Sequence, residues 1–335
     1  MTGNLHGQTI AGVAAAAGVS TMTVSRFFSH PEMLSPTMYE RVKLTVEALN
    51  FIPNATARAL MRGSTETLAL VLADMRHPFF MEVAAGVEEA AQQAGYTLLL
   101  GNSREDLMKE RRYLEGFISR RVEGVIVAPT YGAQHNLDVL GSQGVPTLLI
   151  DRRLPGYAFD VVRGDTFLGG YILTKHLVDQ GYRNITFVGG YLGTSSLVDR
   201  LNGYRKAIEE ANLVERSIAG RYDRESGFEI IDQLVQGDEK FPDALITANN
   251  MVAVGALLAL RKHNLRVPDD VALATFDDFE IASLLDPFLT VVKQPAFEIG
   301  VKATAMLLER ISNPQRPIKE LVLPVELIVR RSTKS

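Results

Sequence analysis

From Thr67 onward, short apolar runs alternate with longer amphipathic segments, and this alternation restricts the possible folds more than any other feature. Strands that alternate with helices at this density are typical of parallel sheets covered by helices on both faces. The apolar runs separate into two groups near Asp160–Arg163, so we expect two lobes. The expected strands are Leu68–Ala73, Thr97–Leu100, Val125–Ala128, Thr147–Asp151, Ile185–Val188, Ala244–Ala248, Val271–Phe276 and Leu289–Val292, and the expected helices include Phe80–Ala94, Phe167–Gln180, Asn250–His263 and Phe297–Ile311.

Polar and aromatic side chains follow several of these expected strands. In open α/β sheets ligands bind beyond the carboxyl ends of the strands, so these side chains form a candidate binding site. Aromatic rings suit the C–H faces of a sugar, and carboxylate, guanidinium and amide groups suit its hydroxyls. An arginine and an aspartate suit an amino acid or a carboxylated purine equally well, so the residues alone leave the ligand open. The candidates are His77, Phe79, Phe80, Asp151, Arg152, Arg200, Tyr222, Asn249, Phe276, Asp277 and Gln294.

The first sixty residues follow a different pattern, with short helical segments and tight turns. An apolar segment at residues 9–16 ends at Gly18, and Ser20 precedes the next segment as an N-cap. A third segment begins at Ser35 and Pro36, an N-cap followed by proline at the first helical position. This order is typical of a helix-turn-helix that reads DNA, although a plain bundle of three helices would produce a similar pattern.

Two motifs in this region resemble the LacI/GalR family of bacterial transcription regulators. The first, A-G-V-S-x-x-T-V-S-R, lies at Ala17–Arg26, and the second, Y-x-P-N-x-x-A-R-x-L, lies at Phe51–Leu60. Three positions depart from the family's pattern: Gly12 replaces an acid, Ser29 replaces an asparagine and Phe51 replaces a tyrosine. The resemblance implies a head that binds double-stranded operator DNA.

The resemblance also implies roles for residues of the second helix. Arg26 would offer a bidentate hydrogen bond to guanine in the major groove. Thr21 and Met22 would point outward at the start of the helix, where the Met22 thioether can contact a thymine methyl group but cannot donate a hydrogen bond. Thr23 and Ser25 would contact phosphate, and the alternative is that both are solvated helix residues.

Residues 54–63 resemble the hinge helix of the same family. Asn54 is a suitable N-cap and Gly63 ends the segment, but a helix this short is only marginally stable alone. The resemblance implies that the segment, which includes Ala57, orders on operator DNA and pairs with the hinge of a second subunit in the minor groove. Leu60 would then insert at the central base step and kink the duplex. Without the resemblance, Leu60 would be an apolar residue in a linker.

Residues 65–330 are similar to the periplasmic sugar-binding fold that this family carries as its effector domain. The candidate residues most resemble the site of ribose-binding proteins, including the Asp151-Arg152 pair, the Phe276-Asp277 pair and Gln294. His77 departs from that pattern, which has an asparagine in its place, and leaves the choice among sugars open. The resemblance implies a ribose-like pentose or a hexose bound between the two lobes.

Composition excludes several other classes of protein. The chain has no cysteine, and its six histidines are scattered without the spacing of a metal site. No apolar window reaches ~18 residues and the N-terminus does not resemble a signal peptide, so we expect a cytoplasmic protein without a membrane segment. Residues 1–63 hold five Lys or Arg against three Asp or Glu, while residues 64–335 hold 30 against 36. This imbalance favours a polyanion partner at the head.

An enzymatic function finds little support in the sequence. The glycine turn at Val188–Gly193 follows an expected strand, but it is not a G-x-G-x-x-G motif. The chain contains no P-loop, no G-x-S-x-G and no H-E-x-x-H, and no pair of nucleophile and base is evident. We therefore expect no catalytic residue, no metal and no cofactor.

The expected fold is α/β, with an N-terminal all-α helix-turn-helix domain followed by a two-lobed periplasmic-binding-protein-like domain. The expected boundaries are 1–53 for the DNA-binding domain, 54–63 for the hinge and 64–335 for effector binding and dimerisation. Lobe 1 would cover about 64–161 and 294–323, and lobe 2 about 162–293 and 324–335. The expected function is a homodimeric repressor whose operator affinity is controlled by a small sugar. The alternatives are a purine or sugar-acid effector, and a solute-binding receptor that serves a transporter.

Overall fold

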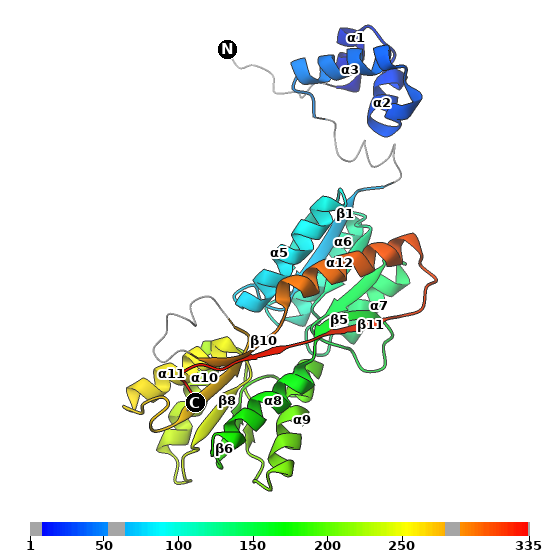
Figure 1. Cartoon of the computed structure of the whole chain (residues 1–335). Coiled ribbons are helices and arrows are strands. Elements are labelled where there is room, and N and C mark those ends of the chain that lie inside the picture. The colour runs from blue at the N-terminus through cyan, green and yellow to red at the C-terminus, as the bar shows by residue number, and fades with distance from the viewer. Residues whose placement is uncertain (1–8, 53–63, 279–288, 334–335) are drawn as a thin grey trace. The chain divides into compact units, whose positions relative to one another are not determined.

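The computed structural model describes residues 9–52, 64–278 and 289–333. The chain divides into two compact units, Met1–Thr67 and Leu68–Ser335. In Figure 1 the first unit is the group of blue helices and the second contains the two sheets with their covering helices. The all-α head and the α/β body that the sequence predicts are both confirmed.

Each described α-helix of the first unit begins at a hydroxyl-bearing N-cap. Thr9, Ser20 and Ser35 each accept a hydrogen bond from the backbone N–H three residues further along. Gly18 ends the first helix with φ 63°, in the left-handed region that glycine adopts without steric cost. The described helices of this unit are α1 (Ile10–Ala17), α2 (Thr21–Ser29) and α3 (Pro36–Ala48), with a 3₁₀ turn, η1 (Pro31–Met33), before α3.

One small apolar core joins these three helices. Val13 of α1, Val24 of α2 and Val42 of α3 are fully buried, and Phe51 packs against them after α3. Among the described residues, no single helix is long and apolar enough to cross a membrane. The pair α1 and α2 meets that test only jointly, on length and composition, and is bent by 109°. Because Val13 and Val24 are buried in the shared core, these apolar residues have a structural role within the head.

The second unit contains two six-stranded sheets in its described residues. In the first sheet β11, β5, β4, β3 and β1 run parallel, and β2 lies at the edge beside β1. In the second sheet all recorded pairs are parallel except β10 with β12. The first sheet, in spatial order, is β11 (Glu320–Leu323), β5 (Asp160–Gly164), β4 (Thr147–Ile150), β3 (Gly124–Val127), β1 (Thr67–Leu72) and β2 (Thr97–Asn102). The second is β12 (Glu326–Ile328), β10 (Thr290–Lys293), β9 (Ala272–Phe276), β8 (Ala244–Thr247), β6 (Ile185–Val188) and β7 (Ser217–Ile218).

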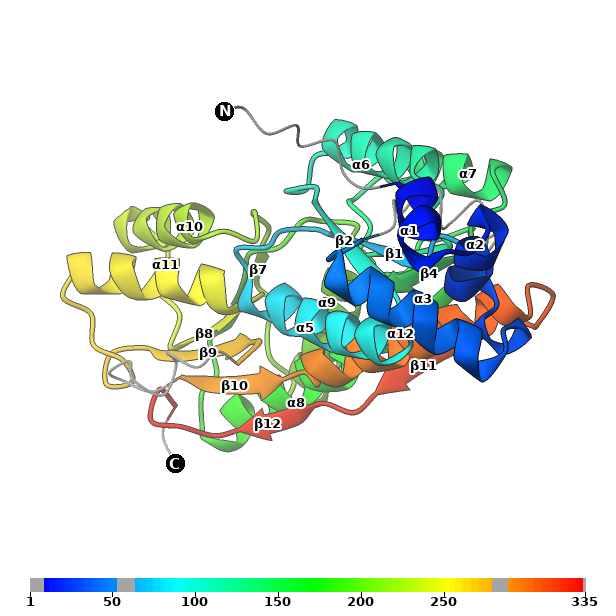
Figure 2. The same cartoon turned by 90° about the horizontal axis from the view of Figure 1, so that it is seen from above.

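Helices cover both faces of each sheet (Figures 1 and 2). Four separate clusters of buried apolar side chains lie between the sheets and these helices, so each lobe has a core on either side of its sheet. The first sheet is covered by α5 (Pro78–Gln93) with α12 (Ala296–Ser312), and by α6 (Leu107–Ser119) with α7 (Gln134–Ser142). The second is covered by α8 (Thr166–Asp179) with α9 (Ser195–Glu210), and by α10 (Arg224–Gln236) with α11 (Asn250–Lys262).

Glycines bring several of these helix pairs into backbone contact, among them α5 and α12. A Cβ atom at Gly86 of α5 would lie 2.1 Å from the carbonyl oxygen of Phe297 in α12. A Cβ atom at Gly300 of α12 would lie 2.2 Å from the carbonyl oxygen of Val83 in α5. Any side chain at either position would force the two helices apart, so both glycines are required for this close approach.

The chain passes between the two sheets three times. It leaves the first sheet after β5, returns to it after β10, and crosses again between β11 and β12 (Figure 1). Residues 160–164, expected from the sequence to separate the lobes, form strand β5 and pair with β4 and β11. The first crossover therefore follows Gly164. The strands β5, β11 and β12 were not expected from the sequence.

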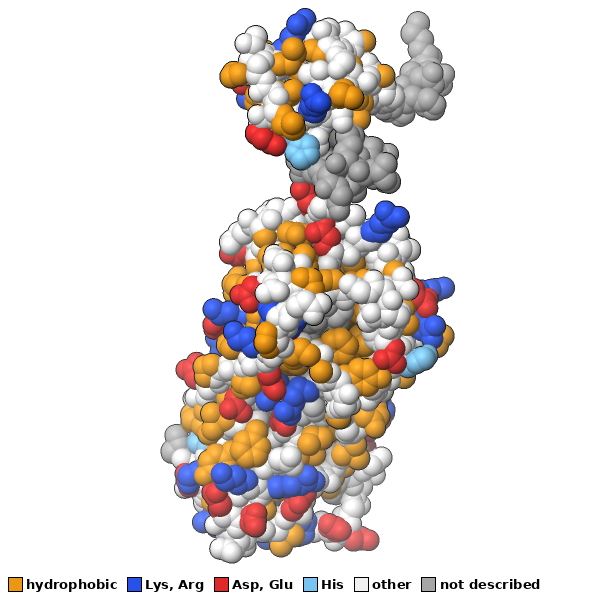
Figure 3. Space-filling view, turned by 90° about the vertical axis from the view of Figure 1, so that its right-hand side faces the viewer, with side chains coloured by type: hydrophobic (Ala, Val, Ile, Leu, Met, Phe, Trp, Pro, Cys, Tyr) orange, Lys and Arg blue, Asp and Glu red, His pale blue; other side chains and the backbone are white. Residues whose placement is uncertain are grey.

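Charged side chains of both signs are intermixed over the second unit on the face shown in Figure 3. Many are joined as short-range pairs within one helix, such as Arg111 with Glu115 and Lys175 with Asp179. Pairs of this kind on an exposed helix surface add little stability, since water screens both charges.

Candidate functional site

The exposed face of α2 carries the side chains expected to read DNA. Met22 is 62% exposed, and Thr21 and Arg26 are also exposed. Val24, on the opposite face, is fully buried in the core of the head. The buried face fixes the helix while the other face stays free to enter a groove, as a recognition helix requires.

Two further candidates of the head are half-buried. The hydroxyl of Thr23 lies 2.8 Å from that of Ser20, so Thr23 also supports the start of α2. Ser25 lies in the middle of the helix, and its backbone carbonyl accepts a hydrogen bond from the Ser29 hydroxyl. The expected hinge residues Asn54, Ala57 and Leu60 lie outside the described residues.

The second candidate site is a cavity of about 30 Å³ between the two lobes of the body. It is lined by nine of the eleven residues proposed from the sequence, which come from strand ends and helix starts of both lobes. Parallel strands bring their carboxyl ends to one edge of a sheet, which explains why distant segments meet here. The lining residues are His77, Phe79, Phe80, Glu105, Asp151, Arg152, Ser196, Arg200, Tyr222, Asn249 and Asp277.

The start of α5 supplies the aromatic part of this wall. Pro78 occupies the first turn of the helix, where its missing N–H costs nothing. Phe79 and Phe80 follow and pack edge to face, with ring centroids 5.2 Å apart. Both also belong to the core of the first lobe, so their position is fixed by packing and not only by a ligand.

All three carboxylates that line the cavity belong to residues with a left-handed backbone. The φ angles are 57° for Glu105, 63° for Asp151 and 67° for Asp277. A residue other than glycine adopts this region at a steric cost, and such residues concentrate at functional sites. The surrounding structure therefore holds these three acids in place against their local preference.

Arg152 is the most heavily paired cation of the cavity. Its guanidinium lies 2.6 Å from a Glu105 oxygen and 3.3 Å from an Asp151 oxygen, and it also donates to the Pro129 carbonyl. Burial acts to lower the pKa of Arg152, but the two neighbouring carboxylates outweigh it and raise the pKa well above its ordinary value. Arg152 thus remains charged inside the cleft.

Arg200 and Asp277 form a second charged pair, and both are buried. Their nearest nitrogen and oxygen are 3.6 Å apart, and Arg200 also donates to the Ala248 carbonyl. Burial raises the pKa of Asp277, while Arg200 opposes that shift. The Nε of Arg200 is buried without a hydrogen-bond partner among the described residues. An unsatisfied buried donor beside a cavity is a natural contact for a ligand.

Phe276 and Gln294 were expected to contact the ligand, but they stand behind the lining residues. The ring of Phe276 is fully buried and lies under the Arg200 guanidinium, 4.4 Å from ring centroid to Cζ. The amide of Gln294 donates to an Asp277 oxygen at 2.7 Å. Each therefore positions a charged group of the cavity. Arg200 itself lies in the second turn of α9.

His77 and Asn249 connect the two lobes directly. Nδ2 of Asn249, the N-cap of α11, lies 3.0 Å from Nδ1 of His77, which precedes α5. Asn249 also donates to the Tyr222 carbonyl, and the Tyr222 hydroxyl lies 3.1 Å from that of Thr194. Burial lowers the pKa of His77, with the charges of Asp74 and Glu105 opposing that shift.

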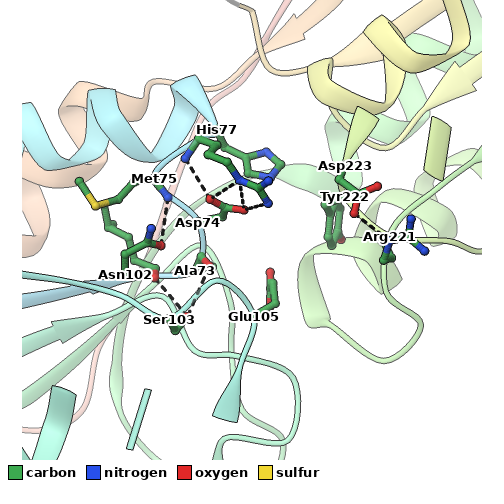
Figure 4. Close-up of polar contacts among 12 residues, drawn as sticks. Ala73, Asp74, Met75, His77, Asn102, Ser103, Glu105, Arg221, Tyr222 and Asp223 are labelled. Atoms are coloured by element: carbon green, nitrogen blue, oxygen red, sulfur yellow. Dashed lines mark hydrogen bonds and ion pairs between the residues drawn. The ribbon is translucent and has the colours of Figure 1, made fainter. Parts of the chain in front are cut away.

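Figure 4 shows the same region with the two lobes facing each other across the gap. On one side Asp74 holds the side chain of Arg76 at 2.5 Å, and on the other Asp223 accepts from Arg221 at 2.8 Å. Burial acts to raise the pKa of Asp74, but its hydrogen bonds from Arg76 prevail and lower it. These pairs border the site, and His77 and Tyr222 belong to the opposite lobes on its two sides (Figure 4).

Glu105 and Ser196 line the cavity but escaped the sequence interpretation. Glu105 lies in the polar segment Arg104–Asp106, which reads as an ordinary surface loop after β2. Ser196 is in the first turn of α9, within a serine pair that reads as a simple helix start. Inspection of every residue after a strand would have reached Glu105, since β2 ends at Asn102. No signal in the sequence distinguishes Ser196 from other serines in the first turn of a helix.

Comparison with known proteins decides the family. The model of bacterial regulatory proteins, lacI family, matches residues 9–54, and that of a periplasmic binding protein-like domain matches residues 174–333. The HTH-type transcriptional repressor PurR of Haemophilus influenzae (strain PittEE) is 33% identical over 334 residues, covering 98% of this chain and 99% of PurR. This chain belongs to the LacI family. As a member of the LacI family it is a transcription regulator that binds DNA, as the motifs predicted.

Solved structures of LacI-family proteins match the fold. The lac repressor dimer bound to operator and the anti-inducer ONPF aligns with a TM-score of 0.84 and 25% identity, covering 98% of this chain and 100% of that one. A LacI-family transcriptional regulator from Enterococcus faecium with bound ribose aligns with a TM-score of 0.73 and 25% identity, covering 80% and 98%. The predicted fold class, a helix-turn-helix head with a two-lobed effector domain, is confirmed.

Proposed function

We propose that this LacI-family member is a repressor whose affinity for its operator is controlled by a small sugar bound between the two lobes. The observation that carries the proposal is the pair Arg200 and Asp277, buried in the cleft with a spare guanidinium N–H. A sugar hydroxyl can accept from that N–H and donate to the carboxylate at once, which few other neutral groups can do.

The remaining lining residues support a ligand rich in hydroxyls. Asp151 and Arg152 supply an acceptor and a donor from the first lobe, while Asn249 supplies an amide from the second. Phe79 and Tyr222 present aromatic surface from opposite lobes, which suits the C–H faces of a pyranose or furanose ring. The similar LacI-family regulator from Enterococcus faecium has the same fold and contains bound ribose, which agrees with a sugar effector.

A purine is the alternative effector, and one observation favours it. The full-length match to PurR is 33% identical, a higher identity than that of the ribose-bound regulator. A planar base would stack on the same aromatic rings, and its ring nitrogens would meet the Arg200 guanidinium. It would leave the carboxylates of Asp151 and Asp277 without the array of hydroxyl donors that a sugar provides.

A binding screen on the purified full-length chain separates these two effectors. Thermal shift identifies candidates among pentoses, hexoses, sugar acids and purine bases, and isothermal titration calorimetry then measures each affinity. We expect a pentose or hexose to bind and Arg200→Ala to weaken that binding by at least tenfold. If a purine base binds and no sugar does, the effector is a purine and the sugar proposal is rejected. Lack of response to every compound would reject both.

The effector would act by changing the relative orientation of the two lobes. Three connections join them, after β5, after β10 and between β11 and β12, and they allow hinge motion without breaking either core. A ligand that contacts both lobes stabilises one arrangement over the other and shifts the population accordingly. We propose that residues 54–63 carry this change to the head, 1–53, in a homodimer that acts on DNA in the cytoplasm without any cofactor. We favour induction, so that the sugar releases the operator.

A further inference from the structure

Two helix starts from opposite lobes meet in the effector cleft. His77 is the N-cap of α5 and Asn249 is the N-cap of α11, and their side chains form a hydrogen bond of 3.0 Å between Nδ1 and Nδ2. His77 makes no capping bond to its own helix, so its ring is free to contact the other lobe. This bond links the two lobes directly.

The orientation of the Asn249 amide follows from its other partners. Its Oδ1 accepts the backbone N–H of Val252 at 2.9 Å, which is the cap of α11. Its Nδ2 donates to the backbone carbonyl of Tyr222 at 3.1 Å, where an amide oxygen would be repelled. A flipped amide would lose both bonds, so Nδ2 is the atom that faces His77, and Nδ2 can only donate.

The protonation state of His77 is therefore determined by hydrogen bonding. Nδ1 must accept, so it carries no proton, and the proton of the neutral ring lies on Nε2. A doubly protonated ring would turn Nδ1–H toward the amide hydrogens of Asn249 and break the bond between the lobes. His77 lines the cavity, and its Nε2 has no hydrogen-bond partner among the described residues. The Nε2–H is thus available to an acceptor atom of the effector.

The charges around His77 do not favour the protonated ring enough to overcome its burial. Asp74 and Glu105 attract a positive charge on the ring, whereas Arg76 and Arg152 repel it. Tyr222, from the second lobe, also lines the cavity, and burial raises the pKa of its phenol, so it adds no charge. Burial is the largest influence, and the pKa of His77 lies below its ordinary value of 6.5.

We propose that His77 is a proton-sensitive clasp between the lobes, which closes on the effector only when the ring is neutral and donates its Nε2–H to an oxygen of that ligand. This proposal rests on the proposed function for the identity of the ligand. His77 replaces the asparagine of the ribose-type pattern. An amide can both donate and accept, but His77 can only donate here, so it selects effectors with an acceptor at this position.

The clasp predicts a direction for the pH dependence of effector binding. The ring loses its proton on closure, so the closed state has the lower pKa and closure is favoured above the pKa of the open state. Lowering the pH from 7.5 to 5.5 should therefore raise the Kd of the effector. At pH 6.0, binding should release protons, because the closed site holds the neutral ring.

Calorimetry on the full-length chain tests this prediction, in two buffers of different ionisation enthalpy at pH 6.0 and across pH 5.5–7.5. His77→Asn keeps a possible bond to Asn249 but cannot titrate, so its affinity should be independent of His protonation and its proton release should vanish. His135→Asn is the matched control, because the His135 side chain is 83% exposed and belongs to the surface of α7. It should behave as the parent. Equal pH dependence in His77→Asn and the parent would overturn the clasp.

A second measurement needs no effector and keeps the two proposals separable. Nitrogen-15 NMR of histidine-labelled protein, with His77→Asn to assign the resonance, reports the tautomer and pKa of His77 in the free chain. We expect an unprotonated Nδ1, a protonated Nε2 and a pKa below 6.5. The opposite tautomer, or a protonated ring at pH 7, would overturn the clasp even if a sugar binds. The expected tautomer in a chain that binds no sugar or purine would support the clasp and reject the proposed effector.

Discussion

Arg152 and Glu105 form the tightest ion pair inside the effector cleft, with 2.6 Å between a guanidinium nitrogen and a carboxylate oxygen. They join the segment after β4 to the loop after β2, and both side chains are largely shielded from water. The pair therefore determines where the Arg152 guanidinium points before any effector arrives. This organisation of the site in advance reduces the ordering cost of binding.

Replacing Glu105 should show how much its ion pair with Arg152 contributes to stability and to effector binding. In Glu105→Gln the buried guanidinium retains only Asp151 as a close anion, so the free energy of unfolding should fall by about 1–3 kcal/mol. The affinity for the effector should fall with it, since Arg152 is no longer held in place. Urea denaturation and calorimetry measure the two effects. Glu115→Gln, which removes a carboxylate from an exposed pair with Arg111, is the control and should change neither quantity. A fully stable Glu105→Gln variant with parental affinity would contradict this interpretation.

Removing Arg26 should affect DNA binding alone. The exposed guanidinium on α2 is expected to contact guanine, and its loss should cost about 1–3 kcal/mol of operator affinity. Fluorescence anisotropy measures this cost at fixed salt on an operator selected from random DNA. Lys43→Ala removes the same charge from α3 of the same unit and should leave sequence preference intact. If Arg26→Ala binds the operator with the same affinity and sequence preference as the parent, Arg26 is not a base-reading residue.

The sequence predicts the interior of the fold better than its margins. All eight expected strands occur, because each is a short, mostly apolar run, and all of them except the edge strand β2 are almost wholly buried. The missed strands β11 and β12 lie at sheet edges and begin with an exposed glutamate. The missed strand β5 carries Asp160, which is buried by ion pairs with Arg310 and Arg316. Such compensation comes from residues about 150 positions away, and no local pattern reveals it.

The sequence predicted those cavity residues that come soon after the end of a strand. His77, Asp151 and Asp277 were found in this way, because strand ends of a parallel sheet share one edge. Glu105 was missed because its side chain reaches the cleft through a left-handed turn, with φ 57°, in a loop of ordinary composition. Gln294 was assigned to the ligand from the resemblance to ribose-binding proteins, and this assignment stays a prediction, since its amide donates to Asp277 behind the cavity wall.

An ion pair that lies outside the cavity also joins the two lobes and should stabilise their closed arrangement. Arg153, which follows β4 in the first lobe, lies 2.6 Å from Asp199 of α9 in the second. Asp199→Asn should weaken effector binding severalfold at low salt, with less effect at high salt, because the Arg153 side chain is partly exposed and its charge is screened. Calorimetry at two salt concentrations checks this. Asp179→Asn, which removes an acid from a pair within α8, should leave affinity unchanged at both. A salt-independent effect would point to altered packing and not to an ion pair.

The central claim is that a sugar bound between the lobes controls operator affinity, and one titration tests it most directly. Fluorescence anisotropy measures operator binding by the parent, Arg200→Ala and Asp277→Ala, each with and without the best sugar from the screen. We predict that the sugar changes the operator Kd of the parent by at least tenfold. Both variants should bind the free operator as the parent does, because their substitutions lie in the effector domain and leave the head unchanged. Neither variant should respond to the sugar, since each has lost a charged partner for its hydroxyls. A sugar response in both variants equal to that of the parent would contradict the account and place the effector elsewhere.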